Sequence, residues 1–361
     1  MVHIGGTNGK GSVAVMVYEA LRASGARVAL YLSPHLVEVR ERIIVDDRPI
    51  TEDAFAMWTE LLVPRIETED ASFFEAATTI AFADFAARRA DIAVVEVGLG
   101  GRLDATNVVA PLATAVTRIA RDHIEYLGES LTEIAREKAG IAKPGVPFVI
   151  GETNPSEAAD LARAAAAVGA EVRRVPPDAV YDGPLSLEGR HQRRNAAVAE
   201  AVVAALPAPY RPGPAQVRHG FARARLPGRF DRRGKWIFDV AHNPDAVEIL
   251  IEALTDAAPP RPLHALAGFL DDKDWRASLA RLSGAVDTLW ATDAPSAPPN
   301  RKWDLDVVRR CLAPRIGIRT EADFGRALVD VQQGAATVLV CGSFHTVGDA
   351  MARLPGFAPL G

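Results

Sequence analysis

Short apolar runs alternate with helical patterns through the first two-thirds of the chain, and this alternation is the strongest constraint on its fold. Val2-His3-Ile4 precedes a glycine-rich loop, and apolar residues then recur at helical spacing from Val13 to Leu21. Gly25 is placed to end this helix, and residues 28–32 have the composition of the next strand. Strand, loop, helix and strand in this order form a βαβ unit, which predicts a parallel sheet.

The other strands predicted for this part are nearly continuous in apolar residues, as is typical of parallel strands buried on both faces. They cover residues 92–97, 113–117 and 148–150. Between them, Ser130-Leu131-Thr132-Glu133 is a capping-box pattern that predicts the start of a helix reaching Ala139. Alanine-rich composition predicts a further helix over 157–170.

The length of 361 residues exceeds what a single compact core usually reaches, so we expect two domains. The pattern breaks at Leu226-Pro227-Gly228, and a new series of strands covers 236–240, 263–267, 288–291 and 338–341. We therefore predict an α/β protein with a domain over 1–221, a linker over 222–228 and a smaller α/β domain over 229–361. The sequence contains no internal repeat.

Composition excludes several classes of protein. Hydrophobic residues make up 48% of the chain and charged residues 24%, which is typical of a soluble globular protein. The net charge of -5 predicts neither nucleic acid nor an anionic membrane as a partner. Cys311 and Cys341 form no metal-binding or disulfide pattern, and the chain opens with no leader and holds no apolar run long enough to span a bilayer. These features predict a cytoplasmic protein.

Residues Gly5 to Ser12 have the components of a phosphate-binding loop. Such a loop needs successive backbone N–H groups, a helix N-terminus, a lysine for the outer phosphates and a hydroxyl for magnesium. The strict GxxxxGK[ST] pattern is not met, because Gly11 intervenes between Lys10 and Ser12. The alternative is a plain glycine-rich turn, but the position between a strand and an amphipathic helix favours phosphate binding.

Three further residues could carry chemistry. Glu96 ends an apolar strand at the sheet edge where ligands bind in α/β proteins, and could hold magnesium. Alternatively it caps a helix or pairs with Arg102. His123 follows another strand and is, by itself, more often a structural residue than a ligand. Lys138, on a predicted helix, would ordinarily be a solvated charge.

Several longer motifs follow one another along the chain. They are GGTNGKGSV at 5–13, YLSPHL at 31–36, ERI at 41–43, EVGLGGRLDATNV at 96–108, DHIEYLG at 122–128, REKAGIAKPGVP at 136–147, HQRRNA at 191–196, LPGRF at 226–230 and DVAHNPDA at 239–246. In this order they resemble the folylpolyglutamate synthase and dihydrofolate synthase branch of the Mur ligase superfamily. The resemblance spans nearly the whole chain and is far more specific than the phosphate loop alone.

The resemblance implies an N-terminal domain like that of P-loop ATPases and a C-terminal Rossmann-like domain. It also implies a reaction in which ATP phosphorylates a carboxylate of a pterin-linked substrate and the amine of L-glutamate attacks the acyl phosphate. The acceptor would be dihydropteroate, a reduced folate or both, which the sequence does not distinguish. Family members are typically monomeric and work with small-molecule substrates.

The resemblance also implies roles for individual residues. ATP would be held by Thr7, Asn8, Gly9, Lys10, Gly11, Ser12, Asn195, Arg229 and Asp239. Two magnesium ions would be held by Ser12, Ser33, Glu96, His123 and Lys138, the last as a carbamate derived from carbon dioxide. Phe74, Asp104 and Ala105 would contact the pterin, and His242 and Ser343 would lie near glutamate. Lys10, His123, Lys138 and His242 would be catalytic.

Two departures from the family pattern stand out. Family members usually carry a helical segment before the phosphate loop, whereas Met1 stands four residues before Gly5, which leads us to expect a start placed too far downstream or a lost segment. Residues 342–346 keep the Gly-Ser of the family pattern and differ after it. The alternatives are a Mur-type ligase for another amino acid and a non-catalytic nucleotide-binding paralogue.

Overall fold

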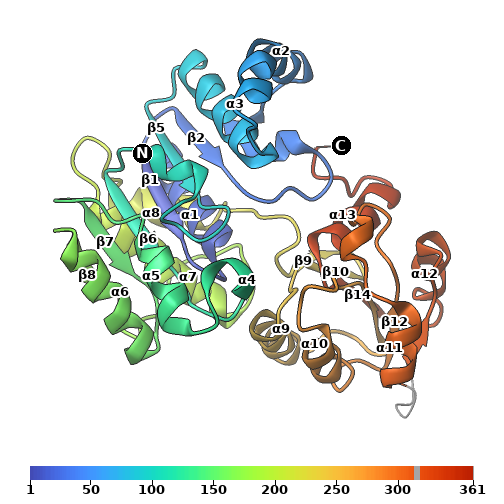
Figure 1. Cartoon of the computed structure of the whole chain (residues 1–361). Coiled ribbons are helices and arrows are strands. Elements are labelled where there is room, and N and C mark those ends of the chain that lie inside the picture. Colours follow the sequence, from blue (N-terminus) through green and yellow to red (C-terminus); the bar gives the residue numbers. More distant parts are fainter. Residues whose placement is uncertain (313–317, 361) are drawn as a thin grey trace. The chain divides into compact units, whose positions relative to one another are not determined.

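The computed structural model describes residues 1–312 and 318–360, which form two compact units (Figure 1). Unit 1 comprises Met1–His35, Val39–Leu187 and His191–Arg225. Unit 2 comprises Leu36–Glu38, Glu188–Arg190 and the chain from Leu226 onward. Each unit has its own sheet and its own hydrophobic core.

An eight-stranded, mostly parallel sheet forms the centre of unit 1. Its strands lie in the order β4 (Arg48–Pro49), β3 (Ile43–Val45), β2 (Val28–Tyr31), β5 (Ile92–Glu96), β1 (Val2–Gly5), β6 (Ala113–Val116), β7 (Pro147–Ile150) and β8 (Glu171–Arg174). The exceptions lie at one edge, where β3 is antiparallel to both of its neighbours, β2 and β4. Ile4 of β1 is in register with Glu96, and Gly5 with Val116, so the loops that follow these three strands begin at the same edge of the sheet.

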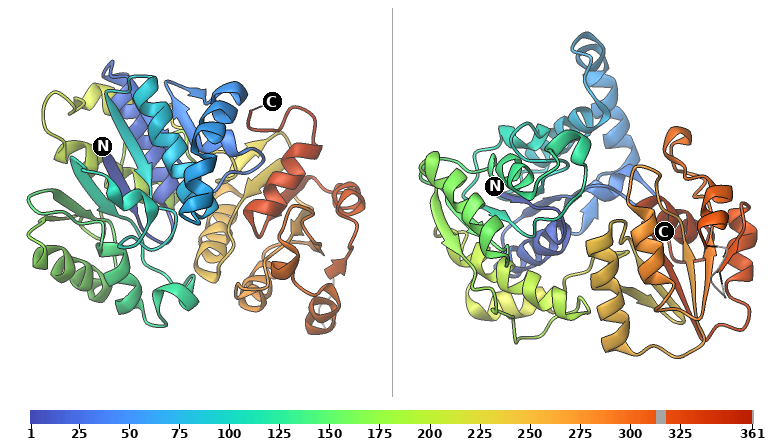
Figure 2. Two further views of the ribbon diagram at one scale, coloured as in Figure 1. Left: turned by 45° about the horizontal axis from the view of Figure 1, so that its top comes forward. Right: turned by 60° about the horizontal axis from the view of Figure 1, so that its bottom comes forward.

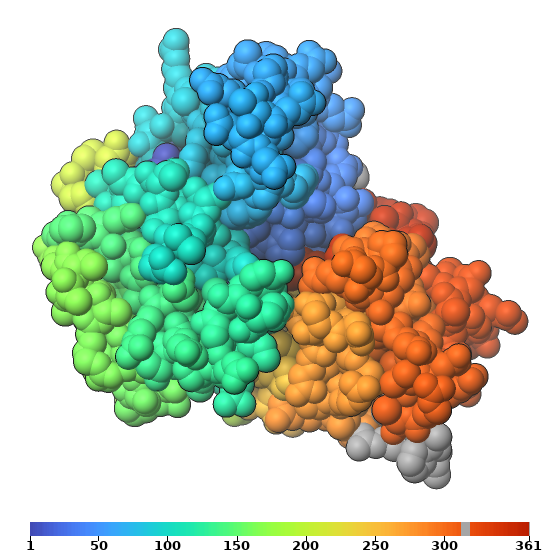
Figure 3. All heavy atoms as spheres, in the orientation of Figure 1, coloured from blue at the N-terminus to red at the C-terminus, as the bar shows by residue number. Residues whose placement is uncertain are grey.

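Helices cover both faces of this sheet (Figure 2). They are α1 (Lys10–Ala23), α2 (Glu52–Thr68), α3 (Phe73–Ala87), α4 (Ile124–Leu127), α5 (Leu131–Ala139), α6 (Pro155–Ala167), α7 (Arg190–Ala205) and α8 (Pro214–Phe221), with short 3-10 helices η1 (Val39–Arg42) and η2 (Ala105–Val108). Helix α1 packs on α8 and α5 on α6. A Cβ at Gly220 would lie 2.5 Å from the backbone nitrogen of Ala20, so the α1–α8 contact requires glycine there. Helix α2 buries none of its residues, and Figure 3 shows it on the surface.

Unit 2 is built around a six-stranded sheet in the described part of the chain. The order is β13 (Ile318–Thr320), β12 (Thr288–Ala291), β11 (Leu263–Ala267), β14 (Thr337–Cys341), β10 (Trp236–Asp239) and β9 (Asp231–Arg233), with β9 antiparallel. The helices are α9 (Pro244–Ala257), α10 (Trp275–Leu282), α11 (Leu305–Leu312), α12 (Phe324–Asp330) and α13 (Phe344–Arg353), with the 3-10 helix η3 (Pro299–Arg301).

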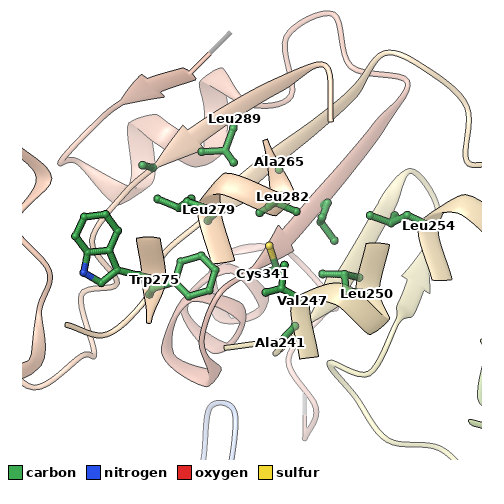
Figure 4. Packing of buried hydrophobic residues seen from close by; sticks show 14 of the residues in the cluster. Ala241, Val247, Leu250, Leu254, Ala265, Trp275, Leu279, Leu282, Leu289 and Cys341 are labelled. Atoms are coloured by element: carbon green, nitrogen blue, oxygen red, sulfur yellow. The ribbon is translucent and has the colours of Figure 1, made fainter. Parts of the chain in front are cut away.

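The core of unit 2 shows why this part of the chain folds as a layered α/β structure. Leu250 of α9 and Leu279 of α10 belong to one buried cluster with Leu289 of β12 and Cys341 of β14 (Figure 4). Each of these four residues is at most 2% exposed. Removing such apolar area from water stabilises a fold by about 25 cal/mol per Å².

The structure confirms the predicted α/β class and the mostly parallel sheet of the N-terminal part. The predicted strands are present to within one residue at their ends, and the capping box of Ser130 and Glu133 begins α5. The short strands β3 and β4 and the polar strand β8 were not predicted, because they are too short or too polar to show an apolar run. Among the described residues, no helix combines the length and apolar character needed to cross a membrane.

Candidate active site

The loop between β1 and α1 turns sharply at two glycines. Gly6 has φ 136° and Gly9 has φ 90°, both in the region that disfavours side chains. A Cβ at Gly6 would lie 2.0 Å from Oγ1 of Thr117, so a side chain has no room there. Helix α1 begins at Lys10, directly after the second glycine, and its first-turn N–H groups have no partner within the helix. The loop therefore provides the backbone donors and helix N-terminus that phosphate binding needs.

The segment that follows β6 holds this loop in place. The backbone N–H of Thr7 donates to the carbonyl of Arg118 at 2.6 Å. The hydroxyl of Thr7 donates to the carbonyl of Ala120 at 3.2 Å and accepts from the N–H of Ala120 at 3.1 Å. Thr117 donates its hydroxyl to the carbonyl of Asn8 at 2.7 Å. Thr117 was not predicted as a site residue; its position at the carboxyl end of a parallel strand is the only signal that could have found it.

Three predicted ATP contacts lie on this loop or beside it. Nζ of Lys10 donates to the carbonyl of Thr7 at 3.1 Å, and Ser12 is 2% exposed within the first turn of α1. Asn195 of α7 lies against the loop, because a Cβ at Gly9 would be 2.7 Å from its Oδ1. The structure thus brings together, within unit 1, residues that are far apart in the sequence.

Glu96 and Ser33, two predicted metal ligands, are in direct contact. The backbone N–H of Ser33 donates to Oε2 of Glu96 at 3.0 Å, and the carboxylate is only 4% exposed. Arg102 pairs with Glu137 at 3.0 Å, so the alternative in which it pairs with Glu96 is wrong.

His123, the predicted imidazole ligand, has an unusual backbone conformation. Its φ of 52° and ψ of 42° lie in the left-handed region, where residues other than glycine are uncommon and often functional. Its N–H donates to Oδ1 of Asp122 at 3.0 Å. Within residues 1–312 and 318–360, no group of three or more His, Cys, Asp or Glu side chains is arranged to hold a metal ion. Glu96 and His123 are the only such residues predicted. The other predicted ligands, which are Ser12, Ser33 and the carbamate of Lys138, would complete the coordination together with nucleotide phosphate oxygens.

Lys138 is a buried residue, so the interpretation in which it is a solvated surface charge is wrong. Its side chain is 4% exposed, and Nζ donates to the carbonyl of Gly6 in the phosphate loop at 3.0 Å. Burial lowers the pKa of Lys138 to about 7, and the charge of Lys10 acts in the same direction, while Asp122 and Asp104 oppose it. A large fraction of this lysine is therefore a neutral amine near neutral pH.

The predicted pterin contacts gather around the loop that follows β5. A Cβ at Gly98 would lie 2.4 Å from the ring of Phe74, so this ring lies directly over the glycine. The ring of Tyr31 is 6.0 Å away, which forms an aromatic pair. Asp104 is 8% exposed, and the next residue, Ala105, is half-buried and begins η2. Aromatic faces and a carboxylate are the groups that can recognise a flat heterocycle with ring N–H donors.

Unit 2 has a second set of predicted residues at the carboxyl end of β10. The carboxylate of Asp239 accepts hydrogen bonds from the backbone N–H groups of Phe230 and Ala241, each at 2.8 Å. Desolvation raises the pKa of Asp239, and the charges of Arg229 and then His242 act in the opposite direction. These contacts hold the carboxylate in one orientation.

Phe344 organises two of the predicted residues in unit 2. The guanidinium of Arg229 lies 4.9 Å from the centre of the Phe344 ring, and the ring of His242 lies 6.1 Å from it. Ser343 is 3% exposed and caps α13, its Oγ accepting from the N–H of Thr346 at 3.0 Å. Phe344 was not predicted as a site residue, because a single phenylalanine carries no sequence signal for such a role.

Two family models match the chain, and together they include all of the predicted site residues except Asn195. The Mur ligase middle domain matches residues 4–175, and the Mur ligase glutamate ligase domain matches residues 228–344. The dihydrofolate synthase/folylpolyglutamate synthase of Escherichia coli (strain K12) is 36% identical over 364 residues, which cover 96% of this chain and 85% of that protein. The chain belongs to the folylpolyglutamate synthase/dihydrofolate synthase family of Mur ligases.

Solved structures of this family share its two-unit fold. The structure of E. coli FolC in complex with DHPP and ADP has a TM-score of 0.85 and 35% identity, and the match covers 97% of this chain and 87% of that one. A bifunctional folylpolyglutamate synthase/dihydrofolate synthase with Mn, AMPPNP and L-glutamate bound also has a TM-score of 0.85, with 33% identity and coverage of 97% and 88%. Members of the family therefore bind nucleotide, a metal ion and glutamate on this fold.

Proposed function

We propose that this protein is an ATP-dependent ligase that joins L-glutamate to dihydropteroate, to the glutamate tail of a reduced folate, or to both. Its membership of a family of glutamate ligases supports this function. The observation that carries it is the meeting of the phosphate loop, the buried Lys138 and the pair Ser33 and Glu96 at one edge of the unit 1 sheet. We expect the protein to act as a monomer.

In this proposal the loop over residues 6–12 binds the nucleotide phosphates. The first-turn N–H groups of α1 and the positive charge of Lys10 stabilise the negative charge that moves to the leaving diphosphate. Asn8 and Gly9 are proposed to supply backbone N–H groups, while Thr7 supports the loop through its own N–H, which donates to the carbonyl of Arg118. The hydroxyl of Thr117 also holds the loop in place, by donating to the carbonyl of Asn8. Asn195, and Arg229 and Asp239 of unit 2, are proposed to hold the rest of ATP.

The residues present fit the magnesium ions that the family implies. Ser12, Ser33, Glu96 and His123 supply oxygen and nitrogen ligands, and bound magnesium would neutralise charge on the nucleotide phosphates. Lys138 is proposed to act as a carbamate. Its neutral amine can attack carbon dioxide with loss of a proton, which converts the amine into an anion that could associate with a metal ion.

The proposed chemistry has two steps. A carboxylate oxygen of the acceptor attacks the γ-phosphorus of ATP, and ADP leaves. The amine nitrogen of glutamate then attacks the acyl carbon, phosphate leaves, and the nitrogen loses a proton. His242 is proposed to assist the second step, and the contact of its Nδ1 with the carbonyl of Val240 at 2.9 Å holds the ring in place.

A substrate panel tests the proposal. The purified protein is incubated with ATP, magnesium and glutamate, with either dihydropteroate or a reduced folate as acceptor, and ADP release is followed together with the product mass. We expect ADP only when glutamate and an acceptor are both present, and a product heavier by one glutamate residue. Turnover with another amino acid and no response to glutamate would instead identify a Mur-type ligase for a different substrate.

Substituting Lys10 by alanine tests whether the loop is catalytic. We expect Lys10→Ala to lower kcat by at least about a hundredfold, since one preorganised electrostatic contact contributes that much to many phosphoryl and acyl transfers. Lys235→Ala, at an exposed lysine in unit 2, is the matched control and should leave kcat unchanged. Nucleotide binding without turnover in the unsubstituted protein would indicate a non-catalytic paralogue.

A further inference from the structure

Three buried side chains form a hydrogen-bonded chain beneath the proposed pterin site. Nε2 of His3, on β1, lies 2.8 Å from Oγ1 of Thr106, and that hydroxyl is hydrogen-bonded to Oδ1 of Asp104. His3 and Thr106 have no solvent-exposed surface, and Asp104 is 8% exposed. The chain therefore connects the strand that leads into the phosphate loop with the loop that carries the acceptor contacts.

The direction of each hydrogen bond follows from the chemistry of the groups. An ionised carboxylate can only accept, so the hydroxyl of Thr106 donates to Asp104. The same hydroxyl oxygen must then accept from His3, which makes Nε2 the protonated nitrogen and leaves Nδ1 bare. Nδ1 of His3 is indeed buried without a hydrogen-bond partner, so no contact favours the other tautomer. Burial, with a smaller effect of Lys143, lowers the pKa of His3 to about 3, so the ring is neutral under ordinary conditions.

The contacts of Asp104 determine how many further hydrogen bonds its carboxylate can accept. Its Oδ1 accepts from both the hydroxyl and the backbone N–H of Thr106, the latter at 2.9 Å. Its Oδ2 accepts from the backbone N–H of Leu99 at 2.8 Å. Since a carboxylate oxygen can accept about two hydrogen bonds, Oδ1 is saturated and Oδ2 has one site left for a ligand N–H group.

We propose that His3 and Thr106 are positioning residues, which hold the carboxylate of Asp104 so that the free site on Oδ2 receives a ring N–H of the acceptor. This inference rests on the proposed function and on the predicted contact of Asp104 with the pterin of the acceptor. The bond from Thr106 fixes the carboxylate plane, and the bond from His3 fixes the hydroxyl that makes it. Without them only the backbone N–H groups of Thr106 and Leu99 hold the carboxylate, and the polar contact with the acceptor is less precisely oriented.

Steady-state kinetics with paired variants tests this role. Thr106→Val and His3→Leu remove the hydrogen bonds, and each should raise KM for the acceptor about tenfold while leaving KM for ATP and glutamate unchanged. Thr106→Ser and His3→Gln keep a hydroxyl and an N–H at the same places, and should return KM to within about threefold of the original value. Thr114→Val is the matched control, because Thr114 is an equally buried threonine whose hydroxyl bonds the carbonyl of Pro147; its acceptor KM should not change. An equal rise in the KM of all three substrates would show a merely structural role and overturn the proposal.

Asp104→Ala separates failure of this inference from failure of the proposed site. If Asp104→Ala raises the acceptor KM while Thr106→Val and His3→Leu do not, the positioning role is refuted and the acceptor site stands. If Asp104→Ala itself leaves the acceptor KM unchanged, the assignment of Asp104 to the acceptor is refuted, and the positioning role with it.

Nuclear magnetic resonance of the protein labelled with 15N-histidine tests the chain without relying on turnover. The signal of His3 is assigned by its disappearance in His3→Gln. We expect a neutral ring with protonated Nε2 and bare Nδ1 between about pH 5 and 8. A proton on Nδ1 with bare Nε2 would overturn the proposal, because Thr106 would then have to donate to His3 and could not donate to Asp104.

Discussion

Substituting Gly98 by alanine would place a methyl group against the ring of Phe74. The new Cβ would lie 2.4 Å from Cζ of the ring, whereas ordinary contact begins at 3.4 Å, so the ring must move by about 1 Å. The φ of Gly98 is not among the positive values, so the backbone itself accepts alanine. The substitution therefore changes the position of one aromatic ring and little else.

We expect this displacement to act on the acceptor alone. A misplacement of about 1 Å in a binding group can cost up to a hundredfold in rate, so kcat/KM for the acceptor should fall between about tenfold and a hundredfold, or about 1.4–2.7 kcal/mol. KM for ATP should not change, because Thr117 and Arg118 hold the phosphate loop through hydrogen bonds that the substitution leaves in place. The melting temperature should change little, since the ring tip can yield.

The assay is ADP release at varied acceptor concentration, for Gly98→Ala, Phe74→Ala and the double variant. Since both changes act on one ring, the double variant should be little worse than Phe74→Ala alone. Gly284→Ala is the control, because a Cβ there meets nothing closer than 3.5 Å. An unchanged acceptor kcat/KM in Gly98→Ala, together with a fall in Phe74→Ala, would refute the argument that the position of the ring matters.

Three further predictions concern the loop, the pH dependence of stability and the metal. Thr117→Val removes the donor to the carbonyl of Asn8 and should raise KM for ATP about tenfold at unchanged acceptor KM; equal changes in both would contradict a role in holding the loop. The pKa of His3 is about 3 in the folded protein and 6.5 for the free side chain. Between these two pH values only the unfolded chain binds the proton, so the folded protein loses stability as the pH falls from about 6.5 to about 3. In urea denaturation, His3→Gln should reduce the stability difference between about pH 7.5 and 4.5 by roughly 3 kcal/mol; an unchanged difference would show that His3 is not a buried neutral ring. A chelator should abolish ADP release and added Mg²⁺ restore it, because the phosphates need a counter-charge; activity in excess chelator would contradict the metal requirement.

The local pattern of the sequence was sufficient to predict much of the secondary structure. Apolar runs of four to five residues predicted the buried parallel strands, since a strand covered on both faces has no polar side. Ser130 and Glu133 predicted the start of α5 because both capping groups lie within one helical turn. Residues 43–49 were missed, because an edge hairpin of two- and three-residue strands has too few residues to show a period.

The order of the motifs along the chain was also sufficient to indicate the family. The environment of each side chain, by contrast, could not be predicted from the sequence. Lys138, on its helix, has the sequence context of a surface lysine, and only its contact with Gly6, 132 positions away, shows that it is buried. The pair His3 and Thr106 is separated by 103 positions. Contacts at such separations depend on which strands become neighbours in the sheet. Secondary structure follows from interactions within a few residues and can be predicted from the sequence, but burial, pKa and hydrogen-bond partners arise only when distant segments pack together.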